Sequence, residues 1–344
     1  MGTPVTSATA ITTPIRWGIL GTGKIAAKFT NDVQKAAEDA IVQAVGSRSR
    51  AGAEAFGDRF GIPTGHRHAS YEALAADPDV DVIYIATPHP WHKEATMLCL
   101  NAGKHVLCEK AFAMNAAQAR VMVDLARRKR RFLMEAMWLR FRPATIRVKD
   151  MLAAGAIGEP VAFSATIGWR GNGDPAHRLY DRAKGGGILL DGTIYPISFA
   201  CHLFGMPEQV ASVASIGPTG VDEQDAISFV HANGVLSTML GTIRANPANT
   251  ASIAGTAGRI ELAARWWQPE TMTLSRDGHE PETFSWPEDG TLGYQYEAMA
   301  VGEAIRAGAI ESDLMPLDET VAIMALMDDL RASWGLRYPA DGAE

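Results

Sequence analysis

The fold is decided close to the start of the chain by Ile15-Arg16-Trp17-Gly18-Ile19-Leu20-Gly21-Thr22-Gly23-Lys24-Ile25-Ala26. The apolar run predicts a buried strand, and the glycine turn ends it before a helix that we expect from about Lys24 to Glu38. A Gly-x-Gly-x-x-Ala turn in this position is typical of dinucleotide binding, because the glycines allow a tight turn and a close approach of the pyrophosphate to the helix N-terminus. The residues expected to contact the dinucleotide are Gly21, Thr22, Gly23, Lys24 and Ile25.

Working outward, strands and helices alternate through the first part of the chain. Apolar strand-like runs cover residues 41–45, 80–86, 105–108 and 132–137, with helical segments between them. This rhythm predicts a doubly wound parallel sheet, a Rossmann domain over residues 1–137, with its ligand at the carboxyl ends of the strands.

The rhythm changes after about residue 138. Strand-like runs then follow one another without helices between them, at residues 160–167, 209–216, 225–231, 235–242, 251–254 and 259–262. Helices are expected at residues 143–154, 197–203, 294–307 and 318–334. We therefore expect residues 138–344 to form an α+β domain with a large, mostly antiparallel open sheet. That this domain binds substrate and makes the oligomer contact is implied by the family resemblance given below. The fold class is α/β overall.

The end of the second strand predicts which dinucleotide is bound. It reads Val45-Gly46-Ser47-Arg48-Ser49, where an NAD site usually has an acidic residue for the ribose 2′-hydroxyl. Ser47 can donate to a 2′-phosphate, and Arg48 can pair with it and lie against the adenine. The sequence therefore predicts NADP as the cofactor.

Two later strand ends add cofactor candidates. Thr87-Pro88-His89-Pro90-Trp91-His92 follows a strand where the chain should pass the nicotinamide ribose. We expect Thr87 and Pro88 to contact the cofactor there, and His92 either contacts it or only begins the next helix. Glu109 and Lys110 end another strand at the same edge.

Two further segments stand out, one that ends at Lys110 and one that carries Asp191 and Tyr195, and the resemblance given below implies that they are catalytic. A glycine triplet, residues 185–187, leads into Asp191, and Tyr195 follows four residues later, which places both on one face if the segment is helical. Aromatic faces and polar donors that suit a sugar ring occur nearby, although interdomain packing would also explain them. These substrate candidates are Trp138, Arg140, Phe141, Trp169, His177, Arg178 and Tyr180.

Composition excludes several other classes. The net charge is −7 with no evident basic face, so a nucleic-acid partner is not expected. The basic run at residues 127–131 is interpreted as the solvated end of a helix. Three cysteines without a CxxC spacing predict neither disulfides nor a zinc site, and the pairs His66/His68 and His89/His92 lack the companions of a recognisable metal motif, so no metal is expected.

The expected location is the cytoplasm. No apolar run approaches the ~20 residues that a membrane span needs, and Met1 to Pro14 lacks the charged start and apolar stretch of a secretory signal. The expected partners are a small polyol or sugar and further copies of the same chain.

With these motifs in view, the chain resembles the glucose–fructose oxidoreductase, inositol dehydrogenase and rhizopine-catabolism family (Gfo/Idh/MocA), most of all its dimeric dihydrodiol dehydrogenases and NADP-dependent D-xylose 1-dehydrogenases. The resemblance runs from about Ile15 to Tyr338 and includes residues 21–26, 86–90, 108–110, 134–141 and 185–195. It implies that Lys110 is catalytic, that Tyr195 stands where many members have histidine, and that the open sheet joins subunits of a dimer or tetramer.

Two residues depart from the family pattern. Ala111 replaces the usual proline after Glu109-Lys110, which removes a restraint on the backbone of Lys110. Gly192-Thr193 replaces an apolar residue followed by glycine, and threonine does not easily adopt positive φ. We therefore expect the backbone to differ locally at these points.

The expected function is NADP-dependent hydride transfer between the nicotinamide and a sugar (an aldose such as xylose or glucose) or a cyclic diol. Tyr195 is the candidate base, with its pKa lowered by the Lys110 ammonium, or Lys110 transfers the proton itself. Asp191 would orient one of these groups or bind a substrate hydroxyl. The alternatives are an NADPH-dependent reductase of a keto-sugar or dicarbonyl, and a non-catalytic NADP-binding regulator.

Overall fold

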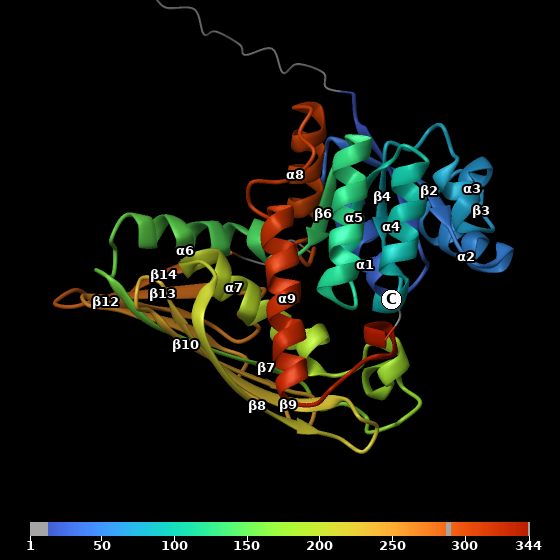
Figure 1. Cartoon of the computed structure of the whole chain (residues 1–344). Helices are drawn as coiled ribbons and strands as arrows, with labels where there is room; N and C mark the ends of the chain where they lie inside the picture. Colours follow the sequence, from blue (N-terminus) through green and yellow to red (C-terminus); the bar gives the residue numbers. More distant parts are fainter. Residues whose placement is uncertain (1–12, 287–289, 343–344) are drawn as a thin grey trace, which may run out of the picture.

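Two sheets dominate the computed structural model, which describes residues 13–286 and 290–342. Figure 1 shows them side by side, with the helices of the first sheet on both of its faces and those of the second sheet on one. The predicted fold class is confirmed. The N-terminal residues in which no secretory signal was predicted lie almost entirely outside the described part.

The first sheet is parallel throughout, in the order β3-β2-β1-β4-β5-β6 that is typical of dinucleotide-binding folds. Its strands are β1 (Ile15–Leu20), β2 (Ala40–Gly46), β3 (Arg67–His68), β4 (Val82–Ile85), β5 (His105–Glu109) and β6 (Leu133–Ala136). The accompanying helices are α1 (Lys24–Ala36), α2 (Arg50–Phe60), α3 (Tyr71–Ala75), α4 (His92–Asn101) and α5 (Ala116–Lys129). Every residue of β4 is buried, which explains its continuous apolar run.

The second sheet has the order β14-β13-β12-β11-β7-β10-β9-β8 and is antiparallel except where β7 pairs with β10. Its strands are β7 (Pro160–Gly168), β8 (Pro207–Ile216), β9 (Asp222–His231), β10 (Leu236–Thr242), β11 (Ala251–Gly255), β12 (Gly258–Leu262), β13 (Thr271–Arg276) and β14 (Glu282–Ser285). The short edge strand β14 and its neighbour β13 were not predicted, because they carry polar and charged side chains along with few apolar ones.

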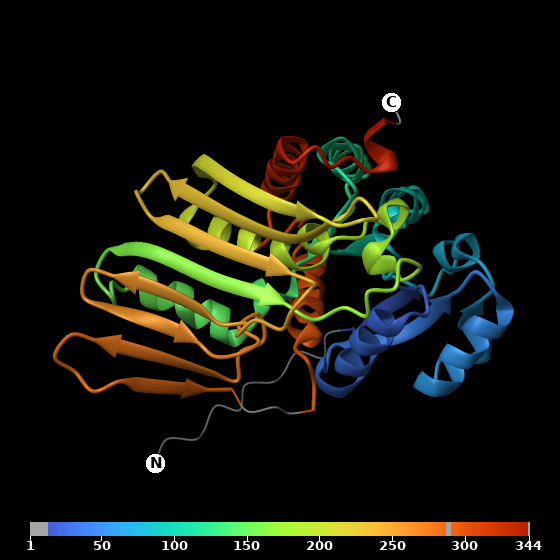
Figure 2. The same ribbon diagram turned by 90° about the horizontal axis from the view of Figure 1, so that it is seen from below.

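Helices cover one face of the second sheet. They include α6 (Pro143–Ala153) and α7 (Ile194–Phe204), while the strands lie open in the view from the other side (Figures 1 and 2). The stretch Arg182–Phe204 is long and apolar enough for a membrane span, but 89% of its most apolar window is buried inside the protein. This segment is therefore a core element under the sheet.

The last two long helices return to the first sheet. Helix α8 (Tyr294–Arg306) packs on α1, and α9 (Leu317–Ser333) packs on α5. The Asp32 carboxylate of α1 accepts hydrogen bonds from the backbone of Leu292, Gly293 and Tyr294 at the start of α8. The two halves of the chain thus share one core, and the division at residue 137 stays a prediction.

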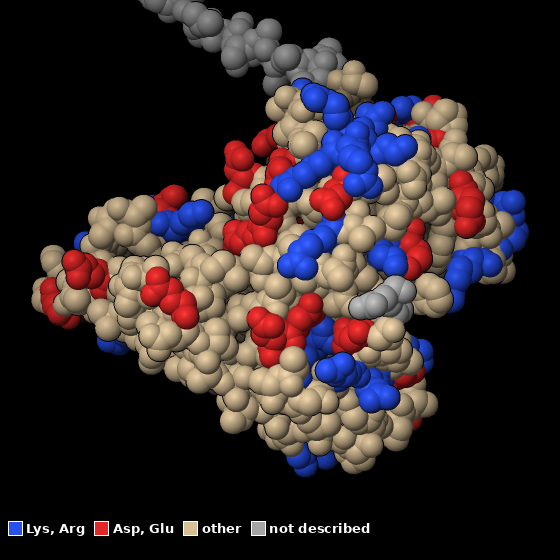
Figure 3. All heavy atoms as spheres, in the orientation of Figure 1, with Lys and Arg blue, Asp and Glu red and all other residues tan. Residues whose placement is uncertain are grey.

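The basic run lies at the end of α5, as interpreted from the sequence. Arg127, Arg128 and Lys129 occupy the last turn, and Arg127 pairs with Asp318 and Glu311. Figure 3 shows Lys and Arg side chains gathered over this end of the molecule with acidic side chains beside them.

Candidate active site

The nucleotide turn has the backbone that its sequence demands. Gly21 has φ of +106°, and a Cβ there would lie 3.0 Å from the Ala86 carbonyl oxygen. Gly23 begins α1 without a side-chain cap, and a Cβ there would meet nothing within 4 Å. The first N–H groups of α1 are therefore open to a phosphate, and the residues fit a dinucleotide pyrophosphate.

Ser47 and Arg48 lie at the end of β2. The backbone N–H of Ser47 donates to the His68 carbonyl of β3 over 3.0 Å. A Cβ on Gly52 would lie 2.6 Å from the Ser47 Oγ, which places this hydroxyl against the first turn of α2. The Arg48 side chain is exposed. A buried donor hydroxyl and an exposed guanidinium thus follow β2, where the sequence places the adenosine ribose.

Lys110 follows β5 and lies against the segment that carries Asp191 and Tyr195. Its Nζ donates to the Asp191 backbone carbonyl over 2.6 Å and lies 4.7 Å from the centroid of the Tyr195 ring. Burial lowers the pKa of Lys110, and the nearby Asp191 carboxylate opposes this effect. A half-buried ammonium with a lowered pKa is suited to exchanging a proton.

Tyr195 does not have the environment that was predicted for a base. Its hydroxyl accepts a hydrogen bond from the Trp138 indole over 2.8 Å, and the side chain is only 8% exposed. Burial raises the pKa of Tyr195, with the Glu109 carboxylate adding to the rise. The expected lowering is therefore corrected, because desolvation is the largest influence on this hydroxyl and raises its pKa.

Asp191 is held in place by a charge partner. Its carboxylate accepts from the Arg178 guanidinium at 2.8 and 3.0 Å, and it is 5% exposed. Although burial alone would raise it, the pKa of Asp191 is lowered by the nearby His89, Lys110 and Arg178. In this arrangement Asp191 orients Lys110 through its carbonyl and Arg178 through its carboxylate.

Arg140 was predicted to contact substrate, and the structure corrects this. The side chain is 0% exposed. It donates to the hydroxyl and carbonyl of Ser198 and to the Glu319 carboxylate. With its donors used inside the protein, Arg140 ties the segment after β6 to α7 and α9.

His92 was predicted to contact the cofactor or to begin a helix. It begins α4, and its ring is completely buried. Nε2 lies 2.8 Å from the Thr87 carbonyl and Nδ1 lies 2.9 Å from the Ala111 carbonyl. The prediction that His92 contacts the cofactor directly is therefore corrected. Its ring instead connects the loop after β4 with the loop after β5.

The other predicted residues are distributed around this centre. Glu109 is buried and accepts from the Lys110 backbone N–H and the Tyr84 hydroxyl. Tyr180 is buried beside Trp169, whereas His177 lies on an exposed loop. Phe141 packs in the main core cluster. Their roles toward cofactor or substrate stay predictions.

Sequence reasoning missed two residues of this region. His89 is 6% exposed, its Nε2 lies 3.9 Å from Asp191, and burial lowers its pKa to about 3. The ring centroid of Trp267 lies 6.4 Å from that of Tyr195. The position of His89 between two prolines was a usable sequence signal that it belongs to the site. The position of Trp267 in a loop offered no such signal.

The departures at Ala111 and Thr193 have different outcomes. The Lys110–Ala111 peptide bond is cis. Residues Leu189–Thr193 form a turn of π-helix, in which Thr193 has φ of −64° and needs no left-handed conformation. The Thr193 hydroxyl donates to both carboxylate oxygens of the buried Asp225, at 2.9 and 2.8 Å. Threonine therefore anchors the segment between Asp191 and Tyr195.

Comparison with family models matches both halves of the chain. Residues 15–137 match the oxidoreductase family with an NAD-binding Rossmann fold, and residues 145–261 match the Gfo/Idh/MocA C-terminal domain. Together these matches cover more than half of the chain, on both of its sheets.

Individual relatives agree with these matches. The human trans-1,2-dihydrobenzene-1,2-diol dehydrogenase is 37% identical over 95% of this chain and 99% of its own length. An aldose–aldose oxidoreductase from Caulobacter crescentus has a TM-score of 0.83 at 25% identity, covering 93% of this chain and 97% of its own. A 3-ketoreductase from Actinomadura kijaniata, in complex with NADP and TDP-benzene, has a TM-score of 0.82 at 26% identity with the same coverage.

Proposed function

Because the chain belongs to the Gfo/Idh/MocA family of oxidoreductases, we propose that it transfers a hydride between NADP and a sugar or cyclic diol. The human relative is named for a cyclic diol and the Caulobacter relative for aldoses. The observation that carries the proposal is the contact of Lys110 with both the Asp191 carbonyl and the Tyr195 ring, on the side of β5 where Glu109 ends the strand.

NADP is favoured over NAD by the end of β2. Ser47 and Arg48 offer a hydroxyl and a guanidinium, and no carboxylate occurs at residues 45–49. Charge-assisted hydrogen bonds from such groups suit a 2′-phosphate, whereas an acidic residue would repel it. The Actinomadura relative, which binds NADP, is consistent with this choice.

Lys110 and Tyr195 have different roles in the proposed proton transfer. The nicotinamide, when bound, supplies the hydride acceptor or donor. In the direction of alcohol oxidation, neutral Lys110 takes the proton that leaves the substrate hydroxyl, which its lowered pKa favours. Tyr195 stays protonated. Its oxygen accepts a hydrogen bond from the Trp138 indole N–H, which leaves its own O–H to donate to the substrate oxygen. Reduction of a carbonyl uses the same groups in reverse.

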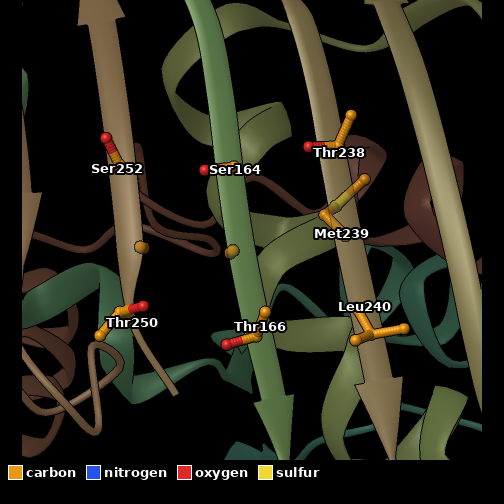
Figure 4. Close-up of a pocket in the computed structure, with 9 residues that line it drawn as sticks. Ser164, Thr166, Thr238, Met239, Leu240, Thr250 and Ser252 are labelled. Atoms are coloured by element: carbon orange, nitrogen blue, oxygen red, sulfur yellow. The ribbon is translucent and has the colours of Figure 1, made fainter. Parts of the chain in front are cut away.

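We assign the face of the second sheet that the helices leave open to the contact between two subunits of a homodimer. Residues of β7, β10 and β11, together with Thr250 just before β11, form a shallow hollow on this face, lined by Ser164, Thr166 and Thr238 among others (Figure 4). Val213, Leu236 and Leu240 are exposed on strands of the same sheet. Small hydroxyl and aliphatic side chains on a flat sheet face suit packing against a second copy.

A reducing compartment is the proposed location, namely the cytoplasm. Cys99, Cys108 and Cys201 are all buried free thiols, and burial raises the pKa of each. Thiols of this kind pack as small apolar side chains and need no oxidising environment.

A substrate screen tests the proposal. Reduction of NADP⁺ is followed by absorbance with aldoses, inositols and cyclic dihydrodiols, and oxidation of NADPH with keto-sugars and dicarbonyls. We expect turnover with at least one aldose or cyclic diol and a higher kcat/KM for NADP⁺ than for NAD⁺. Tight NADPH binding with no turnover of any of these compounds would instead favour the non-catalytic regulator.

A further inference from the structure

Three side chains that the proposed reaction does not use meet at the edge of the first sheet. His66 precedes β3, His68 ends it, and Asp77 lies beyond α3. His66 Nδ1 lies 2.7 Å and His68 Nε2 lies 2.8 Å from the same oxygen of Asp77, Oδ2. The side chains are 22%, 18% and 3% exposed, respectively, so the group is sheltered but can be reached from solvent.

The spacing of these atoms matches ligands of one metal ion. One potential ligand atom from each residue lies within 4.8 Å of the others. Ligands bound to Zn²⁺ at about 2.0–2.2 Å are themselves roughly 3 Å apart. The two nitrogens therefore need to move outward from the Asp77 oxygen by roughly half an ångström, and toward one another from a separation of at most 4.8 Å, to admit an ion. Imidazole nitrogens favour zinc, cobalt, nickel or copper over magnesium or calcium.

The surroundings supply the outer contacts that a metal site needs. In a bound histidine the second ring nitrogen usually donates to a carboxylate or carbonyl. His66 Nε2 lies 3.9 Å from Asp79 Oδ2, on an exposed side chain that can close this gap. Asp77 Oδ1 accepts from the Asp79 backbone N–H over 2.9 Å, and Lys104 Nζ donates to the Val80 carbonyl in the same loop. The loop thus holds Asp77 Oδ1, while Oδ2 faces the two histidines.

We propose that His66, His68 and Asp77 bind one divalent transition-metal ion, with water completing its coordination. Binding moves the ring proton of each histidine to its other nitrogen, and the His66 proton then faces Asp79. The His-x-His spacing alone did not predict this, because Asp77 joins the pair only through the fold.

The ion would be structural. None of the three residues belongs to the catalytic candidates, and the His68 carbonyl holds the Ser47 backbone N–H. Metal at His68 would therefore stabilise β3 and the loop that carries Ser47 and Arg48. The inference is independent of the proposed function, because no step of hydride transfer passes through it.

Cobalt binding to the full-length, chelator-treated protein tests the proposal. Co²⁺ is titrated while its visible d–d absorption is followed, and Zn²⁺ is then added as competitor. We expect one ion per chain, no thiolate-to-cobalt charge-transfer band, and a thermal midpoint that Zn²⁺ raises and Mg²⁺ does not. Absence of stoichiometric binding in the wild-type protein would overturn the proposal.

Variants locate the ion. His66→Gln and His68→Gln should each lower the affinity at least about tenfold and abolish the Zn²⁺ stabilisation, whereas His279→Gln on an exposed turn should change neither. Asp79→Asn changes an exposed side chain and leaves all three ligands intact, so it tests the site even if the histidine variants misfold. It should weaken metal binding about tenfold. Affinities equal to wild type in His66→Gln and Asp79→Asn would place the ion elsewhere and refute the assignment.

Discussion

The ammonium of Lys110 lies 4.7 Å from the centroid of the Tyr195 ring, although one residue follows β5 and the other lies on α7, 85 positions later. Burial acts on the two groups in opposite directions: it lowers the pKa of Lys110 and raises that of Tyr195. The interior therefore favours neutral lysine and neutral tyrosine. These directions support the proposed roles, proton transfer by Lys110 and hydrogen-bond donation by Tyr195.

Removing either group should stop turnover without releasing the cofactor. We expect Lys110→Met and Tyr195→Phe each to lower kcat by about 10²–10⁴-fold, since each deletes a proton donor or acceptor at the reacting oxygen. NADPH fluorescence titration should give a Kd close to wild type for both. Lys149→Met, at an exposed helix position, is the control. Normal turnover by both variants would mean that the catalytic centre lies elsewhere.

The Asp191 carboxylate should set the pH dependence of Lys110. It is the largest influence that raises the pKa of Lys110 against burial. Asp191→Asn removes this charge but keeps the backbone carbonyl that Lys110 contacts. Oxidation requires neutral Lys110, so the rise of kcat with pH should shift to lower pH in the variant. A pH profile of kcat checks this, and a midpoint that stays in place or moves upward would contradict it.

Arg48 should decide between the two dinucleotides. In Arg48→Ala we expect kcat/KM for NADP⁺ to fall about tenfold or more, because one charge-assisted contact of about 1.4 kcal/mol corresponds to that factor. The value for NAD⁺ should change little. Arg59→Ala, exposed on α2, is the matched control. The assignment fails if the wild type prefers NAD⁺, or if the variant keeps the wild-type preference.

Arg140 should affect stability. Replacing it with Met leaves the Glu319 carboxylate and the Ser198 carbonyl without their buried donor. We expect a loss of roughly 3 kcal/mol in the free energy of unfolding, measured by urea denaturation. KM for substrate should stay within about twofold at a temperature where the variant is folded. A large rise in KM with unchanged stability would restore Arg140 as a substrate residue.

The buried Asp225 should make stability depend on pH. Burial raises its pKa to about 7, so the folded protein holds this proton more tightly than the unfolded chain, whose value is near 4. The unfolded state therefore binds fewer protons between these values, and the free energy of unfolding falls as pH rises from about 4 to 7. This contribution is lost above about pH 7.

Asp225→Asn tests that dependence, because the amide cannot ionise. From pH 5 to 8 the variant should lose less stability than the wild type, by a few kcal/mol at most given about 1.4 kcal/mol per pKa unit. Urea denaturation at several pH values measures the difference. Asp174→Asn, on an exposed loop, serves as control. Parallel curves for wild type and Asp225→Asn would show that Asp225 carries no such proton.

Local sequence was enough to predict five of the six strands of the first sheet and the order of its motifs, but not the two-residue strand β3. The apolar strands and the glycine turn at residues 21–23 form through interactions between near neighbours, so their pattern is readable. The segments around Lys110 and Tyr195 could be recognised in the same way. Strand β14 could not, because Phe284 is its single apolar residue, whereas the short alternation of Met272 and Leu274 with polar residues in β13 was overlooked.

What surrounds each side chain was decided by tertiary structure alone. Arg140 forms its hydrogen bonds with groups that are distant in sequence, and so does His66 with Asp77. The raised pKa of Tyr195 depends on how deeply the side chain is buried. The sequence by itself determined which chemical groups the chain carries and which strands present them. Only the fold decided which of those groups lost water and which gained a partner, since desolvation and contact are properties of the packed interior.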